Sequence, residues 1–159
     1  MEKVSIDTDF SNFTATTALN GYGYETGAFA QALPNSVWTV LTNYWDGIPV
    51  LTGDTSSTRS SFSGGVYTIN KTGRYYISVQ CSIGSNSAGY RSLSLLINGV
   101  QQSYSNIPPV VGDRTGMGLS IVLELNDTDT VSARIFQTSG VTLFMSVLVP
   151  GEFTIYRLN

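Results

Sequence analysis

Apolar and polar side chains alternate along most of the chain from residue 37 onward. In residues 73–83, Tyr75, Ile77 and Val79 point to one side, while Arg74, Ser78 and Gln80 point to the other. This two-residue period predicts a strand with one buried face, and Tyr76 is the single aromatic residue on its polar side. The short segment 66–69 precedes it, and a tight turn at Gly73 predicts that the two form a hairpin.

The same period recurs in later segments, and Gly-, Asn- and Pro-containing loops separate them. The segment 93–97 ends at Asn98-Gly99, a strong tight-turn signal because both residues tolerate positive φ. Further strands are predicted at 37–42, 117–125, 131–135, 143–149 and 153–157, with loops at 46–65, 84–89 and 108–113. No segment has a helical period of apolar residues, so the chain is predicted to be an all-β sandwich or jelly roll.

Residues 1–34 differ from the rest of the chain. Their alternation is weak, they contain the segment 20–24 rich in Gly and Tyr, and they end at Pro34. The stretch is too short for a core of its own. We predict an N-terminal arm, linker or attachment segment over 1–34 and one domain over 35–159, in a chain that can be an excerpt of a longer protein.

Several of these segments resemble the complement C1q and tumour necrosis factor superfamily. Residues 65–69 followed by 73–79 resemble its signature hairpin, and the segments 91–99, 119–131 and 153–158 resemble later strands and turns in the same order. The resemblance covers 37–158. Thr128 stands where a Gly is usual, and no collagen-like stalk precedes the domain, which argues against a complement-type protein. The resemblance implies a ten-stranded jelly roll that assembles as a trimer, binds through exposed loops and catalyses nothing.

Composition narrows the possible partners. Only 12% of the 159 residues are charged, and the net charge is −3. The eight Lys and Arg are scattered, which argues against nucleic acid and against an anionic membrane surface, because both need clustered cations. Uncharged polar residues fill the surface, as is common in extracellular and virion β-proteins. The sequence has neither a recognisable secretory signal nor a membrane span. Because of the uncharged polar composition, we expect a virion-surface or extracellular location.

Large apolar residues also fall on the predicted outer faces, where a sandwich in water should be polar. They are Tyr76, Leu96, Val122, Phe136, Phe144, Leu148 and Tyr156. The alternative interpretation is that some of them are simply half-exposed strand residues, as aromatic residues in strands often are. We favour a subunit interface, and we predict a homotrimer with Tyr76, Phe136, Phe144, Tyr156 and Leu148 near the threefold axis.

The chain offers little catalytic chemistry. It has no histidine, and its single cysteine, Cys81, is predicted to be buried, so a Ser-His triad and a thiol hydrolase are both disfavoured. Turn aspartates usually bond nearby backbone amides. The functional alternative is calcium, for which Asp113 and Asp127 are the candidate ligands; no other cofactor is expected.

Exposed aromatic residues beside polar groups are candidates for ligand binding. They are Tyr44, Trp45, Tyr90 with its polar neighbour Arg91, and Tyr104, with packing as the competing interpretation. The leading hypothesis is a trimeric, non-enzymatic head of a virion or cell-surface fibre that recognises a host-surface glycan or protein. The alternatives are a structural capping or trimerisation domain without a receptor of its own, and a secreted signalling ligand of the tumour necrosis factor type.

Overall fold

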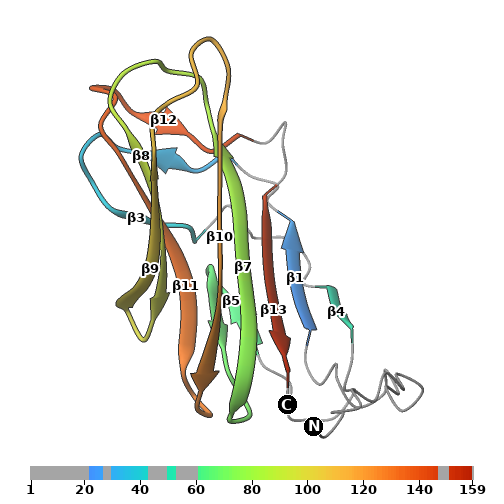
Figure 1. The fold of residues 1–159 in the computed structure, drawn as a ribbon. Helices are drawn as coiled ribbons and strands as arrows, with labels where there is room; N and C mark the ends of the chain where they lie inside the picture. Colours follow the sequence, from blue (N-terminus) through green and yellow to red (C-terminus); the bar gives the residue numbers. More distant parts are fainter. Residues whose placement is uncertain (1–21, 27–29, 43–49, 53–60, 147–150, 159) are drawn as a thin grey trace, which may run out of the picture.

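A computed structural model describes residues 22–26, 30–42, 50–52, 61–146 and 151–158, and these form strands, turns and loops without a helix (Figure 1). Two sheets face each other, as predicted for an all-β sandwich. None of the described residues forms a helix of the length and hydrophobicity that a membrane crossing requires.

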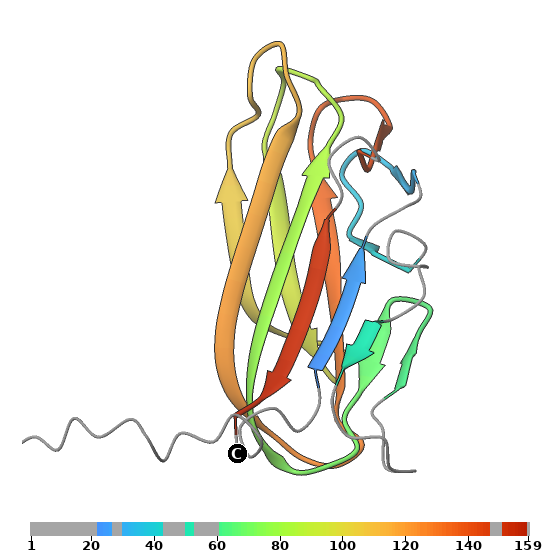
Figure 2. The same cartoon turned by 90° about the vertical axis from the view of Figure 1, so that its right-hand side faces the viewer.

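The first sheet, here called the β7 sheet, has five antiparallel strands that lie side by side in Figure 2. Their order is β10 (Thr115–Leu125), β7 (Gly73–Ile83), β13 (Glu152–Arg157), β1 (Tyr22–Thr26) and β4 (Val50–Thr52). β10 and β7 pair over eleven residues each, which makes them the longest strands of the described chain. Their outward-facing positions therefore form one continuous surface along the molecule.

The second sheet, here called the β11 sheet, packs against the first. Its order is β5 (Ser61–Ser63), β6 (Val66–Thr68), β11 (Thr130–Gln137), β8 (Arg91–Ile97) and β9 (Val100–Ile107), and β3 (Thr39–Val40) pairs with the far half of β11. A small third sheet joins β2 (Ala32–Leu33) to β12 (Leu143–Phe144). The β8–β9 connection has Asn98 at φ 51° and Gly99 at φ 77°, the tight turn that the sequence predicts.

The core lies between the two sheets and contains the residues predicted to face inward. On β7, Tyr75, Ile77 and Val79 are at most 2% exposed, and their neighbours on the other side of the strand are not buried. Phe153 and Ile155 of β13 close the same layer. Tyr75 donates a hydrogen bond from its hydroxyl to the Lys71 carbonyl at 2.6 Å, and burial raises its pKa to about 12. The alternation that predicted these strands thus marks their buried face.

One predicted pairing is wrong. β6 and β7 follow each other in the sequence, but β6 pairs with β5 and β11 while β7 pairs with β10 and β13. The link between them carries the chain from one sheet to the other. It is held by the β10–β11 turn, since the Ile69 amide donates to the Asp129 carbonyl and the Thr128 amide donates to the Ile69 carbonyl, both at 2.8 Å. A crossing between sheets and a hairpin have the same local pattern.

The predicted boundary at residue 34 also needs correction. β1 lies within the stretch predicted as an arm, yet it pairs with β13 and β4 inside the β7 sheet. Leu33 is 1% exposed in the core, and the buried side chain of Gln137 donates to its carbonyl at 2.9 Å. The described residues before 35 therefore belong to the sandwich. Residues 1–21 lie outside the described residues.

Candidate functional site

Two predicted interface residues lie together on the outer face of the β7 sheet. Tyr76 of β7 is opposite Val122 of β10 on one side and Tyr156 of β13 on the other. The two tyrosine rings are 6.1 Å apart, and Val122 is 41% exposed. These three side chains form a bulky row across three strands.

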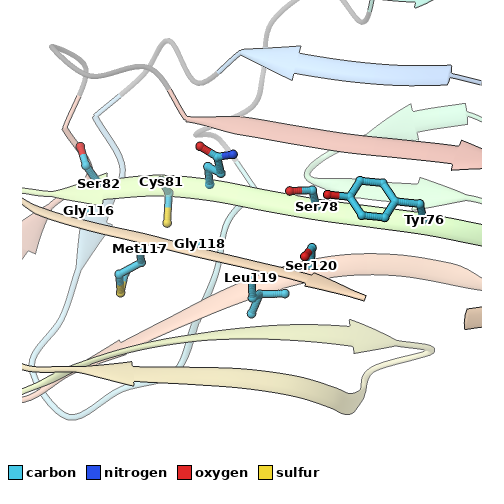
Figure 3. A pocket seen from close by; sticks show the side chains of 10 residues that line it. Tyr76, Ser78, Cys81, Ser82, Gly116, Met117, Gly118, Leu119 and Ser120 are labelled. Atoms are coloured by element: carbon cyan, nitrogen blue, oxygen red, sulfur yellow. The ribbon is translucent and has the colours of Figure 1, made fainter. Parts of the chain in front are cut away.

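Beyond this row the same face is lined by small side chains. Ser78, Gln80 and Ser82 of β7 lie directly opposite Ser120, Gly118 and Gly116 of β10, around a shallow groove of about 550 Å³ (Figure 3). A side chain at Gly116 would meet no atom, and one at Gly118 would make only ordinary contacts at 3.5 Å. Strand glycines destabilise a sheet and often mark the close approach of another chain or a ligand. The bulky row and the groove together are called the groove face below.

The groove also contains an unsatisfied polar group. Ser82 is 3% exposed, and its hydroxyl has no hydrogen-bond partner among the described residues. Buried hydroxyls normally find a partner, because leaving one unbonded costs about 1–3 kcal/mol. The groove face therefore combines open space over glycines with an unused hydrogen-bonding group.

The other predicted interface residues are not on this face. Phe136 lies on β11, on the outer face of the opposite sheet, and Phe144 of β12 is 54% exposed in the small third sheet. Leu96 is buried at 4% exposure beside the β-bulge between β8 and β9. Leu148 lies outside the described residues. The structure thus brings together Tyr76 and Tyr156 and separates them from Phe136 and Phe144.

Phe136 instead belongs to an aromatic cluster on the β11 sheet. Its ring is 5.2 Å from that of Trp38 and 5.8 Å from that of Tyr90. The guanidinium carbon of Arg134 lies 4.3 Å from the centre of the Trp38 ring, within cation–π distance. Trp38 is 38% exposed and Tyr90 is 42% exposed. The cluster therefore presents aromatic surface to solvent beside a positive charge.

Arg134 has polar neighbours but no acidic one among the described residues. Its Nη2 donates to Gln101 Oε1 at 3.2 Å, and the Ser94 hydroxyl donates to the same oxygen at 3.1 Å. Within the described part of the chain, its buried Nε has no partner and its Nη1 makes no hydrogen bond or ion pair. The positive charge is therefore held in place by a ring and an amide and is not neutralised by a carboxylate.

Tyr104 lies on the same face, two strands from Arg134. Arg134 of β11 is opposite Ser94 of β8, and Ser94 is opposite Tyr104 of β9, so the three side chains share one row. Tyr104 is 61% exposed. Two of the predicted ligand-binding residues, Tyr90 and Tyr104, thus border one surface, called the aromatic face below and made of Trp38, Tyr90, Tyr104, Arg134 and Phe136.

The structure gives Arg91 a different role from the predicted one. Its side chain is fully buried, and its guanidinium donates to the carbonyls of Asn86, Ala88 and Tyr90 at 2.9, 2.9 and 3.1 Å. Burial lowers its pKa. Arg91 therefore fixes the 84–90 loop from inside and is not a surface ligand group. Tyr44 and Trp45 lie outside the described residues.

The two aspartates predicted as calcium ligands are far apart. Asp113 precedes β10 and Asp127 follows it, and eleven residues of extended strand span roughly 35 Å, so the two carboxylates do not bind one ion together. The Asp113 side chain instead accepts a hydrogen bond from the Arg114 amide at 2.7 Å. The described residues contain no group of three or more acidic, His or Cys side chains arranged to hold a metal.

A third aspartate, Asp129, shows how a carboxylate in one of these turns bonds to nearby amides. Asp129 accepts hydrogen bonds from the Asn126 amide and the Asn98 side-chain amide, both at 2.7 Å. These bonds lower the pKa of Asp129, the backbone bond most strongly. They join the β10–β11 turn to the β8–β9 turn. In Asp113 and Asp129, the structure supports the interpretation of turn carboxylates as partners of nearby amides.

Cys81 does not provide a nucleophile to the groove. It is 5% exposed and faces the core, and burial raises its pKa to about 12. The thiol is therefore protonated at neutral pH, and a thiol reacts through its thiolate. Besides Cys81, Met117 and Leu119, the groove is lined by hydroxyl, amide and glycine positions, which suit contact with another surface.

Sequence reasoning missed several members of these surfaces, among them Gly116, Gly118 and Arg134. Gly116 and Gly118 could have been noticed, because glycines at successive outward positions of a strong strand are unusual. Arg134 carried no comparable signal. Its ring partner Trp38 is 96 positions earlier in the numbering, and their contact depends on the pairing of β3 with β11.

Comparison with known proteins agrees on the fold. No protein-family model matches the chain, and no curated protein matches its sequence. Solved structures do match: Eiger TNF from S. frugiperda at 12% identity and TM-score 0.64, covering 89% of this chain and 94% of that chain. PRD1 vertex protein P5 matches at 13% identity and TM-score 0.66, covering 89% and 99%.

The globular domain of zebrafish complement 1qA matches at 14% identity and TM-score 0.60, covering 88% of this chain and 98% of that chain. At such low identity, the likeness shows the fold alone. The chain therefore has the same jelly-roll fold as these three structures, the fold that the resemblance of its strand segments predicted.

Proposed function

We propose that the protein is a non-enzymatic, homotrimeric binding head displayed on a virion or another extracellular surface. The observation that carries the proposal is the separation of two unlike surfaces on opposite sheets. If the groove face is covered by neighbouring subunits, the aromatic face of the β11 sheet stays open for a partner. The resemblance to the C1q and tumour necrosis factor superfamily implies the trimer, and the likeness to a vertex protein supports the virion setting.

The shape of the groove face supports self-association. A cyclic trimer uses a heterologous interface, in which two different patches of each subunit meet. The row of Tyr76, Val122 and Tyr156 projects from the face, and the surface over Gly116 and Gly118 recedes from it. A projecting aromatic row and a glycine-floored groove are complementary surfaces for neighbouring subunits.

The mass in solution tests the trimer. Light scattering should give three times the 17.1 kDa subunit mass for the natural chain. Tyr76→Arg should give the monomer mass, because it places a charge in the row. Val111→Arg is the matched control, since Val111 is 81% exposed in a loop, and it should remain trimeric. A monomer mass for the natural chain at micromolar concentration would contradict the proposal.

Binding to cells tests the head. Fluorescently labelled trimer should attach to at least one member of a panel of bacterial and eukaryotic cells, with heat-unfolded protein as the control.

The second candidate function is a capping or trimerisation domain that recognises nothing, which the likeness to a vertex protein also favours. A trimeric mass without attachment to any cell would support that candidate and contradict the binding head.

A further inference from the structure

We propose that the aromatic face binds a sugar that carries a carboxylate, with Arg134 as the group that recognises the negative charge. This inference rests on the proposed function, because it names the partner that the binding head would recognise. The site lies on β11 and β9 and on the residues just before β3 and β8, on the sheet opposite the groove face.

The charge on this face points to an anionic ligand. Arg134 is the one charged residue at the outward strand positions of β11, β8 and β9 that the structure describes. Among the described residues it has no carboxylate partner, and its Nη1 makes no hydrogen bond with any of them. A planar guanidinium pairs best with a carboxylate or phosphate. A single cation is too little for a nucleic acid, which needs several phosphate contacts.

The rings beside Arg134 point to a ligand with an apolar face and many hydroxyls. Trp38 and Tyr90 flank Phe136, and both are more than a third exposed. Binding sites of this kind combine apolar rings with a few placed polar groups that fix orientation. Here the polar groups are the Gln101 amide and the Tyr104 hydroxyl. A sugar ring presents both kinds of surface, with C–H groups on its faces and hydroxyls around its edge.

The spacing of the row suits a small saccharide. Arg134 and Tyr104 stand on strands separated only by β8, so their backbones are roughly 10 Å apart. Ser94 lies between them and is fully buried, so it does not project into the space above the row. A carboxylate at Arg134 therefore leaves the rest of the sugar room to extend toward Tyr104 on one side or over the Trp38 ring on the other.

Calorimetric titration of the trimer tests the inference. The probes are digalacturonic acid and sialyllactose, which carry a carboxylate, and lactose, which does not. We expect the two acidic sugars to bind with weak affinity at each subunit and lactose to bind at least about tenfold more weakly, since one charge-assisted hydrogen bond supplies that factor.

Variants locate the site. Arg134→Gln should weaken the binding of both acidic sugars about tenfold and bring them to the level of lactose. Trp38→Ala and Tyr90→Ala should weaken all three sugars, because they remove ring surface and leave the charge. Arg114→Gln is the matched control, since it also removes one positive charge, from the loop before β10, and it should bind as the natural chain does. Circular dichroism and mass confirm that each variant is folded and trimeric.

Several results would overturn the inference. They are equal binding of lactose and the acidic sugars, unchanged binding by Arg134→Gln, and no sugar binding at millimolar concentration. The proposed function fails separately. Cell attachment by the natural chain that persists in Arg134→Gln and Trp38→Ala would leave the binding head in place and remove this site. A trimer that binds the acidic sugars but attaches to no cell in the panel would support the site and contradict the binding head.

Discussion

The two outer faces of the sandwich are built in opposite ways. The groove face has a short bulky row followed by glycine and serine positions, with open space over Gly116. The aromatic face has rings packed on one another and a cation held against Trp38. The first is shaped to receive another backbone closely, while the second presents rigid groups that a small polar ligand can contact.

Exposed aromatic residues on the two faces therefore have different surroundings and different expected roles. Tyr76 and Phe136 both interrupt a polar strand face in the same way in the sequence. In the structure Tyr76 pairs with the ring of Tyr156 on the neighbouring strand, beside the groove. Phe136 instead packs against the rings of Trp38 and Tyr90. We therefore expect changes at the two faces to have separable effects on assembly and on ligand binding.

The largest expected effect comes from filling the groove. Gly116→Val should weaken self-association about a hundredfold, the scale of one interface hot spot, as measured by sedimentation at several concentrations. In a Tyr76→Arg background, where assembly is already lost, the same change should stabilise the monomer by about 0.5–1 kcal/mol, because a strand favours Val over Gly. Sugar binding should not change. A Gly116→Val protein that assembles normally would remove the groove from the interface.

The next prediction compares Arg91 and Arg134, the two arginines of the β11 sheet, by their contributions to the free energy of unfolding. Arg91→Met should lower the free energy of unfolding by about 2 kcal/mol, because three partly buried carbonyls lose their donor. Arg134→Met should change it by less than about 1 kcal/mol, because among the described residues Arg134 donates a single side-chain hydrogen bond, to Gln101. Urea unfolding of the monomeric Tyr76→Arg background measures both. Equal losses would mean that Arg134 is also structural.

A smaller effect is expected at the β10–β11 turn, away from both faces. Thr128 has φ 72°, a left-handed conformation that is strained for a β-branched residue. Thr128→Gly should raise the free energy of unfolding by about 1 kcal/mol and leave assembly and sugar binding as they are. Thr128→Ala is the control and should give a much smaller gain. No gain from glycine would show that the Thr128 side chain compensates for the strain.

The smallest effect is a pH dependence at the same turn. The folded-state pKa of Asp129 lies below its ordinary value of 3.8, so its stabilising bonds are present above that pH and are lost as the pH falls through the lowered pKa. The stability difference between the natural chain and Asp129→Asn should therefore be constant near neutral pH and shrink below about pH 4. A difference that does not change with pH would mean that the carboxylate charge contributes nothing.

Most strands of the core could be predicted because burial on one face leaves a period of two in the sequence. β7, β10 and β11 follow that pattern, and their inward residues are those that the alternation selects. β1 could not be recognised, since its alternation is weak and its place is set by pairing with β13 at the other end of the chain. The β6–β7 link has the local pattern of a hairpin, because local sequence does not say which sheet a strand joins.

The candidate surfaces divide in the same way. Tyr76, Tyr156, Tyr90 and Tyr104 could be selected from the sequence as aromatic residues at outward or loop positions. Arg91 could not be told from a surface arginine, because its three carbonyl partners come from a loop that folds back over it. The pairing of Asp113 with Asp127 failed because both lie in turns, at opposite ends of one long strand.

Three features can be predicted from the sequence alone. They are the all-β class, the inward faces of the long strands and the order of segments that resembles the C1q and tumour necrosis factor superfamily. These follow from local periodicity, since each strand buries one side. Only the tertiary structure decided that Tyr76 and Phe136 lie on opposite sheets, that Trp38 stacks on Arg134 and that the strand glycines floor a groove. These depend on which strands pair across long stretches of chain, and register over such distances is set by the packing of the whole core.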